Sequence, residues 1–572
     1  MSIFKLQAAK IISTNFPDVS QGSILDSFEQ PKNSEFGDMA LPCFKFAKAL
    51  RKSPIQIADD FISLFNNNEL FESITNIKGY LNFKFSKTTY VKSVLDKYID
   101  KDIFKELSSF AKDKTGKEKT VVIDYSHPNV AKNMGIHNLR STIIGQSIYN
   151  IFKCLGYKTI GVNHLGDWGT QFGKLMWALE KWSSIEEVKE KGILLLNEIY
   201  VKFHKEAEKA PYMEDEARKW FKKLEDNDPD AIKWWKLFIE VSMESYKKIY
   251  KRLDVSFDFV TGESFYIQFL ADTIEKLNAA NLTEISEGAL VVKFDESENM
   301  PPCLLKKSDG ATLYGTRDIA AVMYRLKEFN PDIILYITDI AQQLHFNQVF
   351  KVIERYDPAS KGKLEHIIFG RLSFPDGQMS TRKGNIIPLN EVLDKARDKV
   401  LDILETRDVE VPDSYETAEK IGIGAVIFND LSRSRIKDIE FNWDHILSFE
   451  GETGPHIQYS YVRMHNIMER VGNPKEVRVD HSALTDEYSY DLIKTLDQFA
   501  KKVIQAHDDR EPSVIAHYLI ELAKNFNRFY RNNRIIDAPK DIQDSRIHLL
   551  KILISVYGKC MSLLGLPVVN KM

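Results

Sequence analysis

Several features that mark other classes of protein are missing from this 572-residue chain. It has only four cysteines, Cys43, Cys154, Cys303 and Cys560, which are far apart and form no C-x-x-C pair. This spacing argues against a disulfide framework and against a zinc site, so no protein-held metal is expected. No run approaches the ~18–20 uninterrupted apolar residues of a membrane span, and the first residues lack the apolar core of a signal peptide. We therefore expect a cytoplasmic protein with no membrane partner.

The chain also lacks an excess of charge of either sign. Its 78 Lys and Arg residues nearly balance 82 Asp and Glu residues, which gives a net charge of −4. No molecule-wide basic field indicates nucleic-acid binding, so any polyanionic partner must be bound by local patches. Hydrophobic residues at 43% and charged residues at 28% exclude disorder and a fibre. The length predicts roughly three or four packed units.

The pattern of helices and strands predicts three domains in chain order. Residues 1–95 mix short helical and strand-like runs and predict a small α+β domain, which a charged stretch at 100–120 separates from the next part. Residues 115–400 alternate strands and helices, with a charged, Trp-rich helical insertion at about 178–252. Residues 410–572 are almost entirely helical in pattern and predict an α-helical bundle.

The central domain begins like a doubly wound α/β fold. The β-branched run at 120–125 suits a buried parallel strand, and a polar loop at 126–138 follows it. Apolar residues at helical spacing predict a helix over 139–155, with Gly156 as its stop, and a second strand at 158–166. Ligands of such sheets bind at the carboxyl ends of the strands. The loop at 126–138 is therefore the first candidate site.

Three more strand-like runs follow the insertion, at 288–294, 332–338 and 364–370. Helical patterns separate them. We expect these strands to complete the α/β domain, which closes near residue 400.

The loop at 126–138 has the features of a phosphate-binding loop. It leads into the start of a helix, where unpaired N–H groups and the helix dipole favour anions. His127, Lys132 and His137 add hydrogen-bond donors. Histidines are also common in ordinary surface loops, so the loop alone does not decide its own role.

Two polar patterns further along the chain suggest a second set of ligand contacts. Tyr314 and Asp318 are four residues apart at a predicted helix start, and such a ring and carboxylate suit a guanidinium or ammonium group. A helix-start Asp beneath a core Tyr has the same spacing. Gln342, His345 and Gln348 recur at i, i+3 and i+6 and could present three polar tips to a cleft, as could a solvated helix face.

Two basic segments complete the candidates. The segment at 375–388 carries Arg382 and Lys383 in a stretch without large aliphatic residues, so it could move and clamp a triphosphate. Near the C-terminus, Lys524, Arg528 and Arg531 form one stripe at i, i+4 and i+7. The aromatic residues Phe526, Phe529 and Tyr530 lie among them, and together they suggest a patch for single-stranded RNA. A solvated helix face would also fit.

These segments, in this order and spacing, resemble an arginyl-tRNA synthetase, a class I aminoacyl-tRNA ligase. The resemblance covers nearly the whole chain. It rests on segments at 36–50, 125–145, 163–173, 313–320, 342–350, 379–385 and 449–463, and on the last helices. It implies an α/β, Rossmann-like class I synthetase catalytic domain with a helical insertion, a small N-terminal α+β domain that contacts tRNA, and a C-terminal α-helical anticodon-binding bundle.

The resemblance implies an arginine–tRNA ligase of translation, with L-arginine, ATP with Mg²⁺ and tRNA(Arg) as partners. The arginine carboxylate would attack the α-phosphate of Mg-ATP to form arginyl-adenylate. The arginyl group would then pass to the 2′-hydroxyl of the terminal ribose of the tRNA. Because family members are commonly monomeric, we expect a monomer.

The resemblance also implies roles for individual residues. Tyr314 and Asp318 would take the guanidinium of arginine, while Asn129 and Gln342 would take its α-amino and carboxylate end. The expected catalytic residues are Lys132, His137, Asn138 and Lys383, the expected ATP-binding residues are Gly135, His345, Met379, Ser380 and Arg382, and the expected tRNA-binding residues are Lys524, Arg528 and Arg531.

The chain departs from the family's H-x-G-H sequence at three positions. Gly135 replaces the first histidine, which is expected to meet the ATP phosphates, and Asn138 replaces the second. His137 replaces the glycine that lets adenosine approach the backbone. Two outcomes follow. In the first, the loop is rearranged and His137 supplies the phosphate contact, so the enzyme still works. In the second, ATP binding is weakened, and the protein is a paralogue that either regulates through tRNA or arginine binding or acts as an arginyl-tRNA-dependent transferase. The chain retains the MSTRKG segment and the residues expected to bind arginine, and both favour the ligase.

Overall fold

The computed structural model describes residues 3–571, apart from 32, 67, 100–101, 374–386, 407–412 and 570. The chain divides into two compact units, each built from separated segments. The first comprises Met1–Lys105, Arg463–Phe499 and Glu521–Val556, and the second comprises Glu106–Val462, Ala500–Ile520 and Tyr557–Met572.

The first unit contains a small antiparallel sheet and helices that come from both ends of the chain. The sheet has the order β1-β3-β2, and its strands are β1 (Met39–Pro42), β2 (Phe71–Ile77) and β3 (Tyr80–Phe85). The helices are α1 (Ile3–Asn15), α2 (Gln21–Ser27), α3 (Ala47–Leu50), α4 (Pro54–Ser63), α5 (Lys87–Ile99) and α21 (Glu487–Asp497). Helix α5 packs against α21, where the Tyr98 hydroxyl donates to the Leu496 carbonyl at 2.7 Å.

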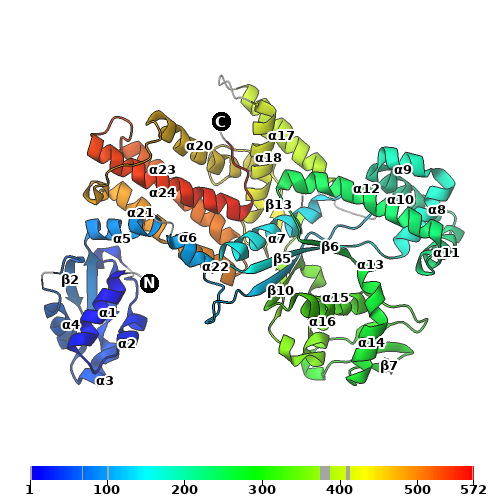
Figure 1. Cartoon of the computed structure of the whole chain (residues 1–572), viewed down its shortest axis with the longest axis horizontal. Coiled ribbons are helices and arrows are strands. Elements are labelled where there is room, and N and C mark those ends of the chain that lie inside the picture. Colours follow the sequence, from blue (N-terminus) through cyan, green and yellow to red (C-terminus); the bar gives the residue numbers. More distant parts are fainter. Residues whose placement is uncertain are drawn as a thin grey trace. The chain divides into compact units, whose positions relative to one another are not determined.

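The second unit is built around a five-stranded parallel sheet (Figure 1). Its strands are β4 (Thr120–Asp124), β5 (Lys158–Leu165), β6 (Phe259–Gly262), β10 (Ile333–Asp339) and β11 (Leu364–Phe369), in the order β11-β10-β4-β5-β6. The chain builds the sheet outward in both directions from β4, so the order reverses between β4 and β10. Ligands of open α/β sheets bind at this switch point, beyond the carboxyl ends of the strands. The predicted Rossmann-like architecture is confirmed.

The helices around the sheet follow the predicted patterns. Helix α7 (Ile136–Cys154) follows β4, and Gly156 has the positive φ of +82° that a helix-ending glycine adopts. The other helices of this unit outside the insertion are α13 (Glu263–Tyr266), α14 (Leu270–Ala279), α15 (Tyr314–Phe329), α16 (Gln343–Tyr356), α17 (Leu389–Glu405), α18 (Ser414–Leu431) and α19 (Trp443–Ile446). Helices α6 (Asp102–Ser108), α20 (Gly454–Arg470), α22 (Phe499–Asp508), α23 (Ser513–Asn532) and α24 (Lys540–Leu564) are divided between the two units.

Two strands differ from the sequence-based expectation. The run at 288–294 forms β8 (Ala289–Val292), which does not join the parallel sheet. It pairs with β7 (Glu284–Ser286) and β9 (Cys303–Lys306) in a small antiparallel sheet, because short connections favour pairing between neighbours in the chain. Strand β6 was not predicted, since it is a short edge strand whose Phe259 and Val260 are exposed and it lacks a buried strand's apolar run.

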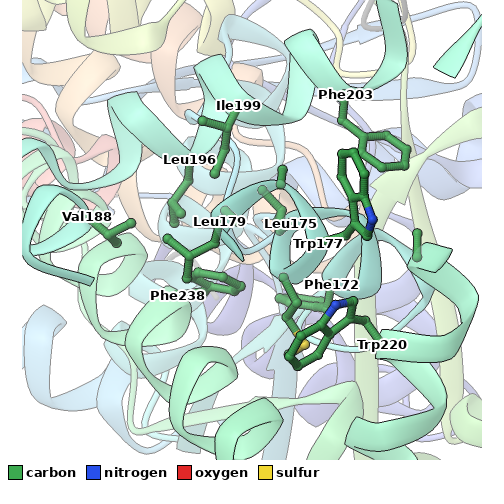
Figure 2. Close-up of a cluster of buried hydrophobic side chains, with 14 of the residues drawn as sticks. Phe172, Leu175, Trp177, Leu179, Val188, Leu196, Ile199, Phe203, Trp220 and Phe238 are labelled. Carbon is green, nitrogen blue, oxygen red and sulfur yellow. The ribbon is translucent and has the colours of Figure 1, made fainter. Parts of the chain in front are cut away.

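The segment between β5 and β6 contains five helices, α8 (Thr170–Trp182), α9 (Ile185–Lys191), α10 (Ile193–Ala207), α11 (Tyr212–Glu225) and α12 (Pro229–Leu253). These helices enclose their own apolar core, part of which is drawn in Figure 2. Trp177 of α8 packs edge-on against Phe203 of α10, with ring centroids 5.6 Å apart. The same core includes Val130 and Ala131 of the loop after β4 and Leu165 of β5, so the insertion packs directly onto the part of the chain that carries the loop.

Helix α24 is long and apolar enough to cross a membrane by length and composition alone. However, 61% of its most apolar 18-residue window is buried inside the structure. Arg546, Lys551 and Lys559 also interrupt its apolar residues. These are the properties of a helix in a protein core.

Candidate active site

The loop between β4 and α7 has an unusual backbone. Ser126, His127 and Ala131 have φ values of 82°, 52° and 65°, a region that residues other than glycine rarely adopt. Such conformations persist only where the surroundings hold them, and they are frequent at functional sites. The loop therefore needs outside support.

Hydrogen bonds from neighbouring elements supply that support. The Ser126 amide donates to the Ser141 hydroxyl of α7 at 2.9 Å, and the Val130 amide donates to the Gly166 carbonyl at 3.0 Å. The Ala131 amide donates at 2.9 Å to a serine hydroxyl of α12. Because these donors are already satisfied by protein groups, the loop is fixed before any ligand arrives.

Lys132 and His137 lie at one end of this loop. The Lys132 ammonium lies 5.1 Å from the centre of the Tyr200 ring of α10, a cation–π contact. Burial lowers the pKa of Lys132 below its ordinary value. His137 is partly exposed, but protein atoms shield its ring from water, and this loss of solvation lowers its pKa. The positive charge of Lys132 lowers the pKa of His137 further. The two residues thus share one electrostatic environment, and His137 is neutral at pH 7.

The other two altered positions help to begin helix α7. Gly135 is the residue before the helix, and its amide donates to the side-chain oxygen of Asn138 at 3.0 Å. Gly135 also pairs with Pro388, and the Ile136 amide donates to the Ile387 carbonyl at 3.2 Å. The last two residues of the predicted basic segment therefore join the loop directly. Met379, Ser380, Arg382 and Lys383 lie outside the described residues.

Asp318 lies one turn after Tyr314 on α15, so the two residues share a face of the helix, as their spacing predicted. His345 Nε2 of α16 lies 2.5 Å from a carboxylate oxygen of Asp318, so His345 holds this acid. Tyr314 is 64% exposed, and the Arg317 guanidinium lies 4.9 Å from the centre of its ring. That contact shows that the ring can hold a guanidinium against its face.

Of the other polar residues expected near the ligand, two are exposed and one makes a contact within the protein. Asn129 and Gln342 are exposed, Asn129 on the loop after β4 and Gln342 just before α16. Gln348 instead donates to the Pro301 carbonyl at 2.7 Å, so it is committed to a structural contact. The predicted row of three polar tips is therefore reduced to two.

Glu263 lies near Asp318 in a group of acids that the sequence had not revealed. Glu263 begins α13 at the end of β6, and the Arg317 guanidinium lies 3.5 Å from its Oε2. This buried oxygen has no hydrogen-bond partner among the described residues. Burial raises the pKa of Glu263 to about 7; Arg317 opposes the rise, whereas Asp318 and Asp167 add to it. The three acids Glu263, Asp318 and Asp167 outnumber Arg317 here, while Asp318 also contacts His345 and Asp167 accepts hydrogen bonds from Ser264.

A buried charge network lies below the loop. Asp124, the last residue of β4, is 2.5 Å from the Arg325 guanidinium and 2.8 Å from His127 Nε2. Burial alone would raise the pKa of Asp124, but the charges of Arg325 and His127 hold it below its ordinary value. His164 lies 3.3 Å from the same guanidinium, and burial lowers its pKa to about 4. The position of Asp124 at the end of a predicted strand could have marked it as a site residue. Nothing in the sequence pointed to Arg325, which lies 201 residues further along the chain.

The C-terminal basic stripe differs from its predicted form. Lys524, Arg528 and Arg531 are exposed, but Phe526 and Phe529 are buried in the helical core. Those two rings cannot stack on bases, because a helix in a bundle turns its apolar side inward. The Arg528 guanidinium also lies 3.6 Å from Asp491 and 3.7 Å from Glu487 of α21.

Among the described residues, no group of three or more His, Cys, Asp or Glu side chains could hold a metal ion. The acids near the sheet are instead paired with Arg325, His345 or Arg317. The site therefore offers separate cationic and acidic regions at one end of the sheet.

Comparisons with known proteins agree with this arrangement. The family model for the catalytic domain of class I tRNA synthetases (R) matches residues 102–443. The arginyl tRNA synthetase N-terminal domain matches residues 6–85, and the DALR anticodon binding domain matches residues 457–572.

Similar proteins span the whole chain. An arginine–tRNA ligase of Alkaliphilus metalliredigens is 42% identical over 574 residues, and one of Halothermothrix orenii is 40% identical over 569 residues, each with 100% of both chains covered. The crystal structure of arginyl-tRNA synthetase from Plasmodium falciparum has 25% sequence identity and a TM-score of 0.77, over 100% of this chain and 99% of that one. The chain belongs to the arginyl-tRNA synthetase family of class I tRNA synthetases.

Proposed function

We propose that the site at the switch point of the sheet activates L-arginine with ATP and transfers it to tRNA(Arg), the reaction of an arginine–tRNA ligase in translation. The protein is an aminoacyl-tRNA ligase by family. One observation carries the assignment of the substrate: the catalytic domain holds an acidic region next to an exposed tyrosine ring and also a loop that carries a lysine. The acidic region contains Glu263 and Asp318, the ring is that of Tyr314, and the lysine is Lys132. A cationic amino acid and a polyphosphate are the ligands that such a pair of regions binds.

In this proposal the acidic region binds the amino acid. Asp318 and Tyr314 take the guanidinium, and Glu263 adds a second carboxylate that the sequence did not identify. The contact of Arg317 with the Tyr314 ring is a model for how the substrate guanidinium would lie. Asn129 and Gln342 take the α-amino and carboxylate groups.

The loop after β4 binds ATP. Lys132 stabilises the transferring phosphates, with His137 beside it as the replacement for the missing histidine. Gly135 and Asn138 shape the start of α7, and His345 is proposed to contact ATP from α16. Met379, Ser380, Arg382 and Lys383 are proposed to clamp the triphosphate from the basic segment. Magnesium is proposed to enter with ATP, bound to its phosphates.

The tRNA is proposed to bind along all three domains. Residues 1–95 contact it at the N-terminal domain, residues 115–400 carry the reaction, and residues 410–572 bind the anticodon. Lys524, Arg528 and Arg531 are exposed cations that support phosphate contacts in the last domain. We propose a cytoplasmic monomer that needs no membrane.

Aminoacylation tests this function. The full chain with Mg-ATP, labelled arginine and tRNA(Arg) should form arginyl-tRNA, and Asp318→Asn should raise the KM for arginine by about 100-fold, because it removes a charge-assisted contact. The control Asp272→Asn, on α14 where Asp272 pairs with Lys276, should not change it. Absence of charging together with retained tRNA or arginine binding would support the regulator or transferase instead.

The altered phosphate loop gives a second prediction. His137→Ala should raise the KM for ATP by about tenfold, because a neutral imidazole that donates to a phosphate is lost. The KM for arginine should stay within about twofold of the wild type, since His137 lies by Lys132 rather than in the acidic cluster. Unchanged ATP kinetics would show that His137 does not replace the missing histidine.

Glu263 makes arginine binding dependent on pH. Its pKa of about 7 means that the side chain is mostly neutral at pH 6 and mostly ionised at pH 8, and the groups that face it are Arg317, Asp318 and Asp167. The KM for arginine should therefore fall as the pH rises from 6 to 8, by at most about tenfold. Glu263→Gln should flatten this profile, whereas the profile for ATP stays the same in both proteins. Parallel arginine profiles would contradict the role of Glu263.

A further inference from the structure

We infer that helix α12 aligns the two substrates through a ladder of three buried hydroxyl groups, those of Ser242, Tyr246 and Tyr250. This inference rests on the proposed function and deepens it. It assigns positioning residues for the reaction to the helical insertion, which carries none of the residues predicted to touch a substrate.

The three residues are spaced by four along α12, so they share one face of the helix. All three are buried, with 0%, 0% and 5% of their surfaces exposed. Figure 1 shows α12 as the long helix that connects the other insertion helices to the sheet. Its buried polar face therefore meets the loop after β4.

The first step of the ladder holds the strained end of the loop. The Ser242 hydroxyl donates to the Phe238 carbonyl at 2.6 Å within the helix, which points its lone pairs outward. It then accepts the amide of Ala131 at 2.9 Å. Ala131 is one of the loop residues with a positive φ, 65°. Ser242 therefore stabilises a backbone conformation that alanine disfavours.

The second step joins the two substrate regions. The Tyr246 hydroxyl lies 2.7 Å from both the Asn129 carbonyl and the Lys132 carbonyl, so its one proton is shared between them. Asn129 is proposed to hold the arginine, and Lys132 the phosphates. The Lys132 amide also donates to the Asn129 carbonyl at 3.3 Å, so the Tyr246 hydroxyl reinforces a turn that sets the distance between the two residues that must bring the carboxylate to the α-phosphate.

The third step orders a chain of hydroxyls that reaches helix α7. The Tyr250 hydroxyl accepts from the Asn163 amide at 3.0 Å, so its proton goes to Ser126, 2.8 Å away. Ser126 in turn donates to Thr142 at 2.9 Å, because Thr142 donates to the Asn138 carbonyl at 2.7 Å. Each hydroxyl has one proton and one acceptor, so the chain has a single direction.

This arrangement predicts a specific kinetic defect. Alignment contributes to the rate only when both substrates are bound, whereas each substrate alone can still be accommodated by small shifts of the loop. Loss of the Tyr246 hydroxyl should therefore reduce kcat much more than it raises the KM for arginine or for ATP. A residue with a merely structural role would lower the melting temperature without this split.

The test compares Tyr246→Phe with Tyr557→Phe. Tyr557 is a matched control, because its buried hydroxyl donates to the Ile457 carbonyl at 3.0 Å on a different helix. In aminoacylation, Tyr246→Phe should lower kcat by about 10- to 100-fold and change each KM by at most about threefold. The two variants should have similar melting temperatures.

A binding measurement keeps the inference separate from the proposed function. A non-hydrolysable sulfamoyl analogue of arginyl-adenylate occupies both regions at once, and its Kd for Tyr246→Phe should rise by about 10- to 100-fold in calorimetry. Arginine alone should bind within about threefold of the wild type. If the wild type binds the analogue but does not charge tRNA, the proposed function fails and the analogue still decides the inference. Equal Kd values for Tyr246→Phe and Tyr557→Phe, or failure of the wild type to bind the analogue, would overturn it.

Discussion

The backbone of the connection between β4 and α7 is the constraint on which the rest of the site depends. Three residues that are not glycine adopt left-handed conformations there, which cost free energy and must be stabilised by contacts. Neighbouring side chains and carbonyls from α7, α12 and the end of β5 provide them. A loop held in this way cannot collapse when it is empty, so it presents Asn129 and Lys132 in fixed positions.

Electrostatics then separates the two ends of the site. The buried pair of Asp124 and Arg325 satisfies the charge beneath the loop, so neither residue competes for a ligand. Around Asp318 and Glu263 the acids exceed the bases, and a cation is favoured. At Lys132 the reverse holds, and an anion is favoured. The altered residues at 135–138 keep this division, because Gly135 and Asn138 begin the helix while His137 stays beside the lysine.

The features that could be predicted from the sequence are those set by residues close together in the chain. The strand and helix on either side of the loop follow from local spacing, and so does the placement of Tyr314 and Asp318 on one face of α15. Glu263, Arg325 and Tyr246 were beyond such reasoning, because the fold brings them to the site from distant elements. The buried Phe526 and Phe529 show a further limit: helical spacing identified the stripe but left open whether its aromatic rings stack on bases or face the bundle core.

Hydrogen exchange of the ligand-free full chain tests the central claim, that the loop is formed before substrates bind. The amides of Ser126, Val130 and Ala131 are hydrogen-bonded to protein groups and should exchange about as slowly as those of the adjacent strand β4. Exchange of these amides as fast as that of an unstructured peptide, with protection only after arginine and ATP are added, would contradict the account.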